Sequence, residues 1–318
     1  MAKKIILDCD PGVDDAMALA YAVGSPDLDL LGVTTVAGNV SLAKTTGNAL
    51  RVLEFLGAAA APVTAGSALP LLRPSLTAEH VHGEDGLRGA RLPAATARPQ
   101  PGHATDFIID TVLAAPGEVT LVAIGPLTNI ALALRREPAL AGSVRDFVIM
   151  GGSSGRGNVT PAAEFNIAVD PEAAAIVFSA GWTVTMVGLD VTLQATASAD
   201  VTARLGALGP LGSELLLPCV RSYADGDRVV TLPGPDPEST DPAVHDVCAV
   251  AYVARPDLLR CQPARVEVET TGQWTSGMTV TDFRAPAAGC NALVATAIDV
   301  PAFWDSVLAA YSRAAAAM

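Results

Sequence analysis

The chain has 318 residues, of which 50% are hydrophobic and 17% charged, so it is long and apolar enough to bury a large core. Its formal net charge of −13 repels phosphate backbones and anionic headgroups, which argues against nucleic acid and membrane surfaces as partners. No stretch approaches the roughly 20 apolar residues of a membrane span. Five scattered cysteines without a C-x-x-C pair argue against a disulfide framework. We therefore expect a cytoplasmic location.

Short apolar runs alternate with helical patterns along the chain, which is typical of repeated β-α units. Strands rich in Val, Ile, Leu and Thr are predicted over 4–10, 28–37, 119–124, 145–150 and 183–189. Helices are predicted over 14–22, 42–56, 171–179 and 247–254. A strand pair is predicted over 266–270 and 278–281, and a closing strand over 292–298. The pattern predicts an α/β fold with a predominantly parallel central β-sheet flanked by helices, as in a Rossmann-like open sheet.

Two long irregular segments interrupt this pattern, at about 73–103 and 206–242. Loops of this length in a compact domain are usually lids or binding loops, and the alternative is a surface insertion. We find no linker, composition shift or internal repeat, so we expect a single domain over 1–318.

Four carboxylates lie within residues 8–15, directly after the first apolar run: Asp8, Asp10, Asp14 and Asp15. Because side chains alternate along a strand, Asp8 and Asp10 share one face, and Asp10 lies at the carboxyl end, where open α/β sheets bind ligands. The Pro-Gly turn lets the two acids of the next helix point back towards Asp10. We expect these acids to converge.

Clustered acids destabilise a fold unless protons or a cation compensate, and all-oxygen ligands favour a hard cation such as Ca²⁺ or Mg²⁺. Acids in a first helical turn can also simply stabilise the helix dipole, but this does not account for Asp8 and Asp10. A second alternative is a phosphatase in which the first acid of the Asp-x-Asp pair is the nucleophile, although Pro11 follows the pair here. We infer a divalent metal.

Further candidates come later in the chain. The turn at 124–129 follows an apolar strand, so Thr128 is a possible N-cap and the carbonyl of Ile124 a possible metal ligand. The mix of acceptors and donors on Asn158, Glu164 and Asn166 suits a polyhydroxyl group such as a sugar, and a solvated loop is the alternative.

His245 and Asp246 precede the apolar run 247–254. Histidine can donate or accept a proton near neutral pH, and Asp246 can bind the metal or cap the helix. His80 and His82 have the spacing of zinc ligands, but no third ligand stands nearby, so we expect His82 to line a pocket instead.

The opening motif D-x-D-P-G-x-D-D-A at 8–16 resembles the signature of the inosine-uridine-preferring nucleoside hydrolase family. Further family-like motifs follow in family order: Asn39, the G-P-L-T-N turn at 125–129, M-G-G at 150–152, E-F-N at 164–166 and His245-Asp246. The resemblance implies a parallel α/β fold, a bound Ca²⁺ and hydrolysis of ribonucleosides to base and ribose. It also implies a homodimer or homotetramer.

The resemblance also implies roles for single residues. The calcium ligands would be Asp10, Asp15, Asp246 and the Ile124 carbonyl, and Asp10 would also be the general base. His82 and His245 would lie by the base, and because the departing base needs a proton, we expect His245 to be the catalytic proton donor. The substrate would be bound by Asp14, Asn39, His82, Asn158, Glu164 and Asn166.

The residue before Asp246 bears on the preferred base. Purine-specific relatives tend to have a tryptophan there, whereas this chain has His245, so inosine and uridine or pyrimidine nucleosides are expected. Some pyrimidine-selective members have a glutamine and a tyrosine upstream, and here Tyr223 is present without the glutamine. Ser276 stands where relatives often have arginine, and Trp274 lies near it. A non-catalytic nucleoside- or sugar-binding protein is a further alternative.

Overall fold

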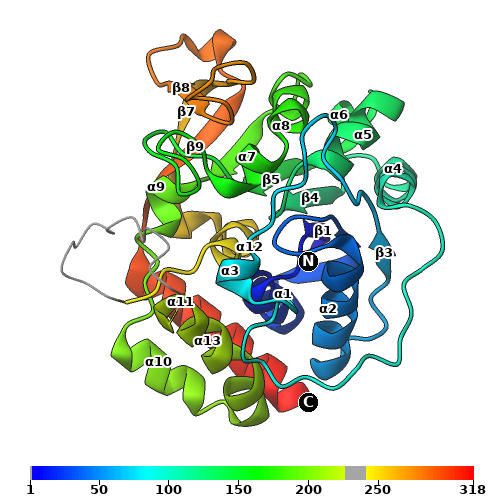
Figure 1. Cartoon of the computed structure of the whole chain (residues 1–318), viewed down its shortest axis with the longest axis vertical. Coiled ribbons are helices and arrows are strands. Elements are labelled where there is room, and N and C mark those ends of the chain that lie inside the picture. The colour runs from blue at the N-terminus through cyan, green and yellow to red at the C-terminus, as the bar shows by residue number, and fades with distance from the viewer. Residues whose placement is uncertain (1, 226–240) are drawn as a thin grey trace.

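The computed structural model describes residues 2–225 and 241–318, without the side chains of 223–225. Within these residues, nine strands form one sheet in the order β3-β2-β1-β4-β5-β6-β9-β7-β8 (Figure 1). The strands are β1 (Lys3–Cys9), β2 (Leu28–Thr35), β3 (Val63–Ala65), β4 (Val119–Ala123), β5 (Asp146–Met150), β6 (Val184–Val187), β7 (Leu259–Val268), β8 (Thr279–Asp282) and β9 (Ala292–Ile298). Pairs from β3 to β9 are parallel, and β7 runs antiparallel to both β9 and β8.

Helices lie against both faces of this sheet (Figure 1). They are α1 (Val13–Gly24), α2 (Leu42–Phe55), α3 (Glu79–His82), α4 (Ala104–Ala114), α5 (Thr128–Arg136), α6 (Leu140–Ser143), α7 (Phe165–Val169), α8 (Pro171–Phe178), α9 (Leu189–Thr192), α10 (Ala199–Gly206), α11 (Leu217–Asp225), α12 (Asp246–Ala254) and α13 (Val300–Ala317). Short turns are the π-helical η1 (Leu211–Leu216) and the 3-10 turns η2 (Pro256–Leu258) and η3 (Ala287–Gly289).

The two faces of the sheet have separate hydrophobic cores. In β1, Ile5 and Leu7 pack into the core shared with α1, α2, α12 and α13, whereas Ile6 packs into the core shared with α4, α5 and α8. This alternation follows from the two-residue period of a strand, and it explains why β1 is apolar at consecutive positions. The predicted fold class is confirmed.

Several elements differ from the sequence-based expectation. The segment 206–242 was expected to be a loop, but residues 211–225 are helical and 226–240 lie outside the described residues. β7 begins at Leu259, seven residues before the expected strand, and β3 and α13 were not expected. Between 73 and 103 the chain is irregular apart from α3, as predicted.

The order of the strands brings two candidate site residues, Asp10 and Ile124, to the same edge of the sheet. Successive β-α units run outward from β1 to β2 and β3 on one side, and from β4 to β5 and β6 on the other, so the switch point lies between β1 and β4. Ligands of open α/β sheets bind at the carboxyl ends of the strands at such a point. Asp10 directly follows β1, and Ile124 directly follows β4.

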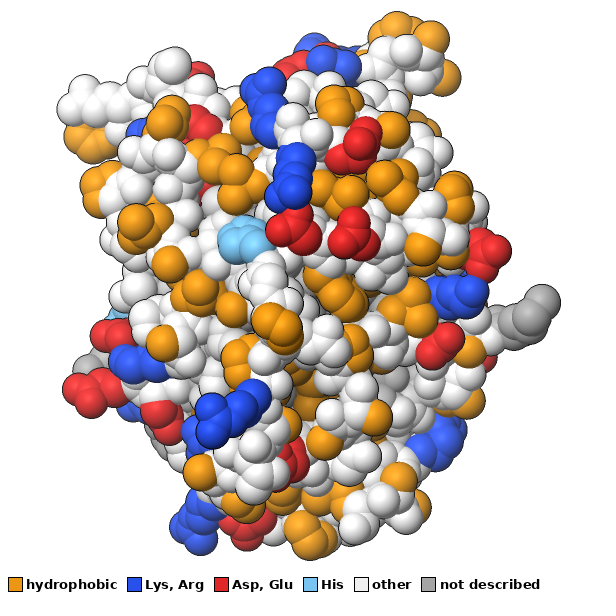
Figure 2. All heavy atoms as spheres, turned by 90° about the vertical axis from the view of Figure 1, so that its right-hand side faces the viewer, with side chains coloured by type: hydrophobic (Ala, Val, Ile, Leu, Met, Phe, Trp, Pro, Cys, Tyr) orange, Lys and Arg blue, Asp and Glu red, His pale blue; other side chains and the backbone are white. Residues whose placement is uncertain are grey.

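The surface gives two further observations. None of the helices that the structure describes combines the length and hydropathy needed to cross a membrane. On the face drawn in Figure 2, basic side chains stand among acidic and apolar ones and form no continuous basic patch.

Candidate active site

The turn between β1 and α1 brings Asp15 back to the end of the strand. Gly12 is the N-cap of α1 and Asp15 is its third residue, so the Asp15 carboxylate accepts from the backbone N–H of Gly12 at 2.9 Å. It also accepts from the N–H of Asp10 at 3.1 Å. A Cβ on Gly12 would lie 2.5 Å from His82 Nδ1, so a side chain does not fit in this turn. The predicted convergence of Asp10 and Asp15 is therefore present.

The Asp10 carboxylate is enclosed by backbone. Its Oδ2 accepts from the N–H of Asn39 at 2.6 Å, and a Cβ on Gly125 would lie 2.5 Å from its Oδ1. A Cβ on Gly38 would clash with Oδ2. Within the described residues, Oδ1 has no hydrogen-bond partner although Asp10 is fully buried. A buried oxygen of this kind requires a ligand, a proton or a cation.

A group of three carboxylates, Asp15 among them, lies at the start of two helices. Asp14 and Asp15 of α1 and Asp246 of α12 have oxygens within 4.8 Å of one another, and all three residues are buried. Burial and the charge of Asp14 raise the pKa of Asp15 to about 7. Burial and the charges of Asp14 and Asp15 raise the pKa of Asp246 well above its usual range. Burial and Asp15 likewise raise the pKa of Asp10.

The donor set suits a hard divalent cation. All the candidate ligand atoms are carboxylate oxygens, and the carboxylates repel one another. Asp14 Oδ1 has no hydrogen-bond partner among the described residues. A divalent ion would compensate this buried charge and leave the acids ionised. The group shares Asp15 and Asp246 with the predicted ligand set, but it contains Asp14, to which the resemblance gives a substrate role, and it does not include Asp10.

Asn166 links the end of β4 to that of β5. Its Nδ2 donates to the carbonyls of Ile124 at 3.0 Å and Met150 at 3.1 Å. Glu164 is the N-cap of α7 and accepts from the N–H of Asn166 and of Gly152, both at 2.9 Å. Burial raises the pKa of Glu164 to about 7. Of the predicted sugar-binding residues, Asn166 therefore contacts the Ile124 carbonyl, and Glu164 orients Asn166 from the start of α7.

Asn158 and Tyr223 are the other substrate candidates. Asn158 is half-buried and its Oδ1 accepts from the N–H of Phe165, directly after Glu164, at 2.9 Å. Tyr223 belongs to α11, but its side chain lies outside the described residues.

The two predicted base-side histidines approach the carboxylates from different elements. His82 ends α3, is buried, and accepts from the N–H of Val13 at 3.2 Å through Nδ1. Burial lowers the pKa of His82 to about 4. His245 is the N-cap of α12, and burial lowers its pKa as well. His80 is exposed, so the two histidines of the H-x-H pair do not share one environment.

A layer of polar residues beneath Asp10 escaped the sequence reasoning. Asn129 donates to Asp8 Oδ1 at 2.8 Å and to the Thr35 carbonyl at 3.0 Å, and it accepts from the N–H of Ser67 at 2.9 Å. Thr34 also donates to Asp8, at 2.5 Å. Burial raises the pKa of Asp8 to about 7. The only sequence signal was the turn at 124–129, which gives no indication of these long-range contacts.

The N-cap expected at Thr128 is wrong. Leu127 is the N-cap of α5, and it makes no side-chain cap. The Thr128 hydroxyl instead donates to Asp170 Oδ2 at 2.7 Å. Asp170 is the N-cap of α8, where its Oδ1 accepts from the N–H of Ala173 at 3.0 Å, so Thr128 joins the starts of α5 and α8.

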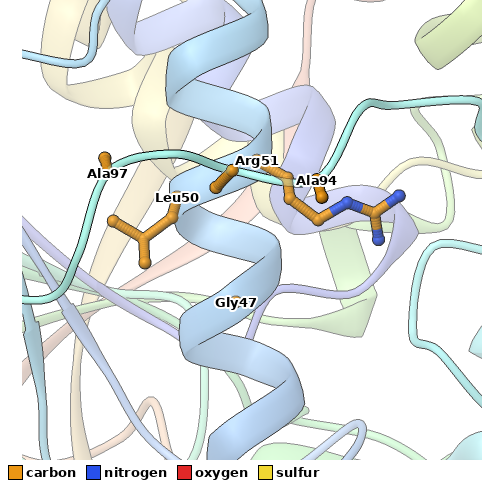
Figure 3. Close-up of a pocket in the computed structure, with 6 residues that line it drawn as sticks. Gly47, Leu50, Arg51, Ala94 and Ala97 are labelled. Carbon is orange, nitrogen blue, oxygen red and sulfur yellow. The ribbon is translucent and has the colours of Figure 1, made fainter.

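A groove of about 400 Å³ lies elsewhere, between α2 and residues 94–97 (Figure 3). Its one charged lining residue, Arg51, donates to the carbonyls of Leu92 and Pro93. The groove offers no carboxylate or histidine, so the carboxyl end of the sheet remains the candidate active site.

Comparisons with known proteins identify the family. Residues 5–305 match the model of the inosine-uridine preferring nucleoside hydrolase family. The chain belongs to this family. It is 44% identical to the inosine-uridine preferring nucleoside hydrolase of Crithidia fasciculata, over 98% of each chain. It is 47% identical to the non-specific ribonucleoside hydrolase RihC of Salmonella newport, over 97% of this chain and 98% of that one.

A solved structure agrees with this assignment. The purine-preferring ribonucleoside hydrolase from Gardnerella vaginalis superposes with a TM-score of 0.89 at 33% identity, covering 98% of this chain and 99% of that one. The chain is thus a nucleoside hydrolase, an enzyme class that cleaves the N-glycosidic bond of nucleosides. Family membership argues against the phosphatase alternative.

Proposed function

We propose that this nucleoside hydrolase converts ribonucleosides to free base and ribose by a calcium-dependent mechanism in which Asp10 is the general base. The observation that carries the proposal is the convergence of buried carboxylates at the β1–β4 switch point, with Asp10 Oδ1 lacking a protein partner among the described residues. Buried acids with perturbed pKa values beside a ligand-binding edge are typical of active sites.

Calcium is the proposed metal. Asp10, Asp15, Asp246 and the carbonyl of Ile124 would hold it, and the all-oxygen donor set supports a hard cation over zinc or copper. When bound, the ion would supply a water of lowered pKa and keep the carboxylates ionised.

Asp10 would take the proton of the attacking water. Its Oδ2 is engaged by Asn39, so Oδ1 is the oxygen that remains for this proton within the described contacts. Burial and the charge of Asp15 raise the pKa of Asp10, which makes its carboxylate a stronger base. The water oxygen would then bond to the anomeric carbon as the glycosidic bond breaks.

The ribose would be bound by the polar residues around these carboxylates: Asp14, Asn39, Asn158, Glu164 and Asn166. Loss of the base leaves positive charge on the ribose ring, and nearby carboxylates stabilise such an oxocarbenium-like state. The acidic cluster thereby has a second role besides metal binding.

The base would lie near His82, Tyr223 and His245, with His245 as the hydrogen donor to the leaving base. We propose that inosine and uridine or pyrimidine nucleosides are preferred over a strict purine set, because His245 occupies the position before Asp246. The names of the two relatives at 44% and 47% identity support a broad range of nucleoside substrates.

We further propose that the enzyme works as a homodimer or homotetramer in the cytoplasm, without nucleic acid or membrane partners.

A reducing-sugar assay on inosine, uridine, cytidine, adenosine and guanosine, with a phosphate-release control, tests this function. Ribose from inosine and uridine without phosphate is expected. Phosphate release from a phosphoester would favour the phosphatase alternative. Binding of nucleosides without ribose release, in a folded and calcium-loaded sample, would favour a non-catalytic binding protein.

A further inference from the structure

Thr192 lies against His245 and is not among the residues expected from the sequence. It is the last residue of α9 and is fully buried, and its Oγ1 lies 2.8 Å from His245 Nδ1. α9 and the start of α12 come from distant parts of the chain but lie close together (Figure 1).

A short backbone pairing holds the two segments in this position. The N–H of Ala197 donates to the carbonyl of Pro242 at 2.8 Å, and the N–H of Val244 donates to the carbonyl of Ala195 at 3.1 Å. Thr196 and Ala243 form an antiparallel bridge between them. The backbone directly before His245 is therefore fixed relative to the end of α9, so the contact with Thr192 does not depend on side chains alone.

The direction of this hydrogen bond follows from the number of hydrogens. Within the part of the chain that the structure describes, the Thr192 hydroxyl has a single hydrogen-bond partner, His245 Nδ1. A fully buried hydroxyl places its one hydrogen on the acceptor available to it. The hydroxyl then donates to Nδ1, so the hydrogen of the neutral ring is on Nε2.

We infer that Thr192 is a positioning residue that makes His245 present Nε2–H to the leaving base. The inference rests on the proposed function and refines one part of it. As the bond between the anomeric carbon and the base breaks, its electron pair passes to the base, and the water proton passes to Asp10. His245 keeps its hydrogen and donates it as a hydrogen bond, and solvent protonates the base after release. A neutral ring can act in this way without becoming an imidazolate.

Two substitutions separate this role from simple packing. Thr192→Val keeps the shape and removes the hydroxyl, and Thr192→Ser keeps the hydroxyl. With inosine at about pH 8 and saturating calcium, we expect Thr192→Val to lower kcat by about 10- to 100-fold with little change in KM, because one preorganised hydrogen-bond donor to developing charge contributes about 10²- to 10³-fold and Thr192 acts on that donor indirectly. Thr192→Ser should retain most of the kcat of the natural enzyme. With 4-nitrophenyl riboside, whose leaving group needs no hydrogen donor, Thr192→Val should change kcat less than about twofold.

Matched controls make each outcome decisive. Thr120→Val removes another fully buried hydroxyl, which has no hydrogen-bond partner among the described residues, and should leave both substrates unaffected. His245→Ala should impair inosine far more than the nitrophenyl substrate, and equal losses would contradict the proposed role of His245. If His245→Ala discriminates between the substrates and Thr192→Val does not, the inference about Thr192 is wrong while the proposed function stands.

The tautomer can be read directly. The chain has 4 histidines, so ¹⁵N NMR of the calcium-loaded enzyme can assign the His245 ring by comparison with His245→Ala. We expect the Nε2–H tautomer in the natural sequence and a loss of this single form in Thr192→Val. An Nδ1–H tautomer in the natural sequence would overturn the inference whatever the kinetics.

Discussion

Asn39 binds Asp10 through two hydrogen bonds: its backbone N–H donates to the carboxylate Oδ2 at 2.6 Å, and its Nδ2 donates to the Asp10 carbonyl at 3.2 Å. The same Nδ2 donates to Asp15 at 3.1 Å. Asn39, in the loop that follows β2, therefore fixes the orientation of both Asp10 and Asp15. These contacts hold the Asp10 carboxylate in one orientation before substrate binds, which reduces the reorganisation needed during the reaction.

Asp10→Asn should abolish turnover without unfolding the protein. The amide has the same shape and can still accept from Asn39, but it cannot take a proton or bind a cation as an anion can. We expect inosine hydrolysis to fall by about 10³-fold or more. The circular dichroism spectrum and the melting temperature in chelator should stay close to those of the natural enzyme. The metal-free fold does not depend on an ionised Asp10, because burial raises the pKa of this carboxylate. Activity within tenfold of the natural enzyme would refute the role of Asp10.

Gly125→Ala should impair catalysis through Asp10. The added Cβ would lie 2.5 Å from Asp10 Oδ1, so the carboxylate must move. A displacement of about 1 Å can cost about 100-fold in rate, and we expect a loss of kcat of that order for ribose release.

Gly47→Ala is the control for this change. In the part of the chain that the structure describes, nothing lies within 4 Å of a Cβ at Gly47. The residue is inside α2, so the substitution should raise the free energy of unfolding by about 0.5–1 kcal/mol. Its kcat should be unchanged. Equal activities of the two variants would show that the space around Asp10 is not restrictive.

Asn129→Ala should destabilise the fold. It leaves Asp8, the Thr35 carbonyl and the Ser67 N–H without the partner that joins them. Unsatisfied buried groups cost about 1–3 kcal/mol each, so we expect the free energy of unfolding to fall by about 2–4 kcal/mol in a urea titration. Thr120→Val removes a buried hydroxyl that has no hydrogen-bond partner among the described residues, so it should not lower the free energy of unfolding. A loss below 0.5 kcal/mol would contradict the proposed importance of this layer.

The end of β1 was predictable from the sequence because its cause is local. An apolar run followed by acids, a Pro-Gly turn and a helix start specifies where Asp10 and Asp15 lie. Asn129 and Thr192 could not be found in this way, because each acts on a residue more than 50 positions away. Their positions depend on the order of the strands, which no short pattern reveals.

The elements that were missed also have physical reasons. β3 has only three residues, and β7 contains Pro263, which normally argues against a strand interior. α13 is alanine-rich and gives a weak periodic signal, although it packs so closely on α1 that a Cβ on Gly24 would clash with the Ala310 carbonyl. Tertiary contacts rather than local preference decide these segments.

The metal-free enzyme should lose stability as the pH rises. Burial raises the folded-state pKa of Asp8 and Asp15 from 3.8 to about 7, so between these values the folded state holds more protons than the unfolded state. The free energy of unfolding then decreases from about pH 4 to about pH 7. Calcium keeps its ligands ionised and removes part of this penalty.

Melting temperatures measured from about pH 5 to pH 8, in chelator and in calcium, test this linkage. The rise in melting temperature caused by calcium should be larger at pH 8 than at pH 5, because protons compete with the ion at low pH. A calcium effect that is independent of pH, or larger at pH 5, would contradict the assignment of these carboxylates to the metal.

The central claim is that the buried carboxylates bind a calcium ion needed for ribonucleoside hydrolysis. The most direct measurement is ribose release from inosine by enzyme dialysed exhaustively against chelator, before and after addition of Ca²⁺, with Mg²⁺ and Zn²⁺ in parallel. We predict loss of activity on dialysis and recovery with calcium in preference to the other ions. Full activity in enzyme shown by elemental analysis to contain no metal would contradict the account.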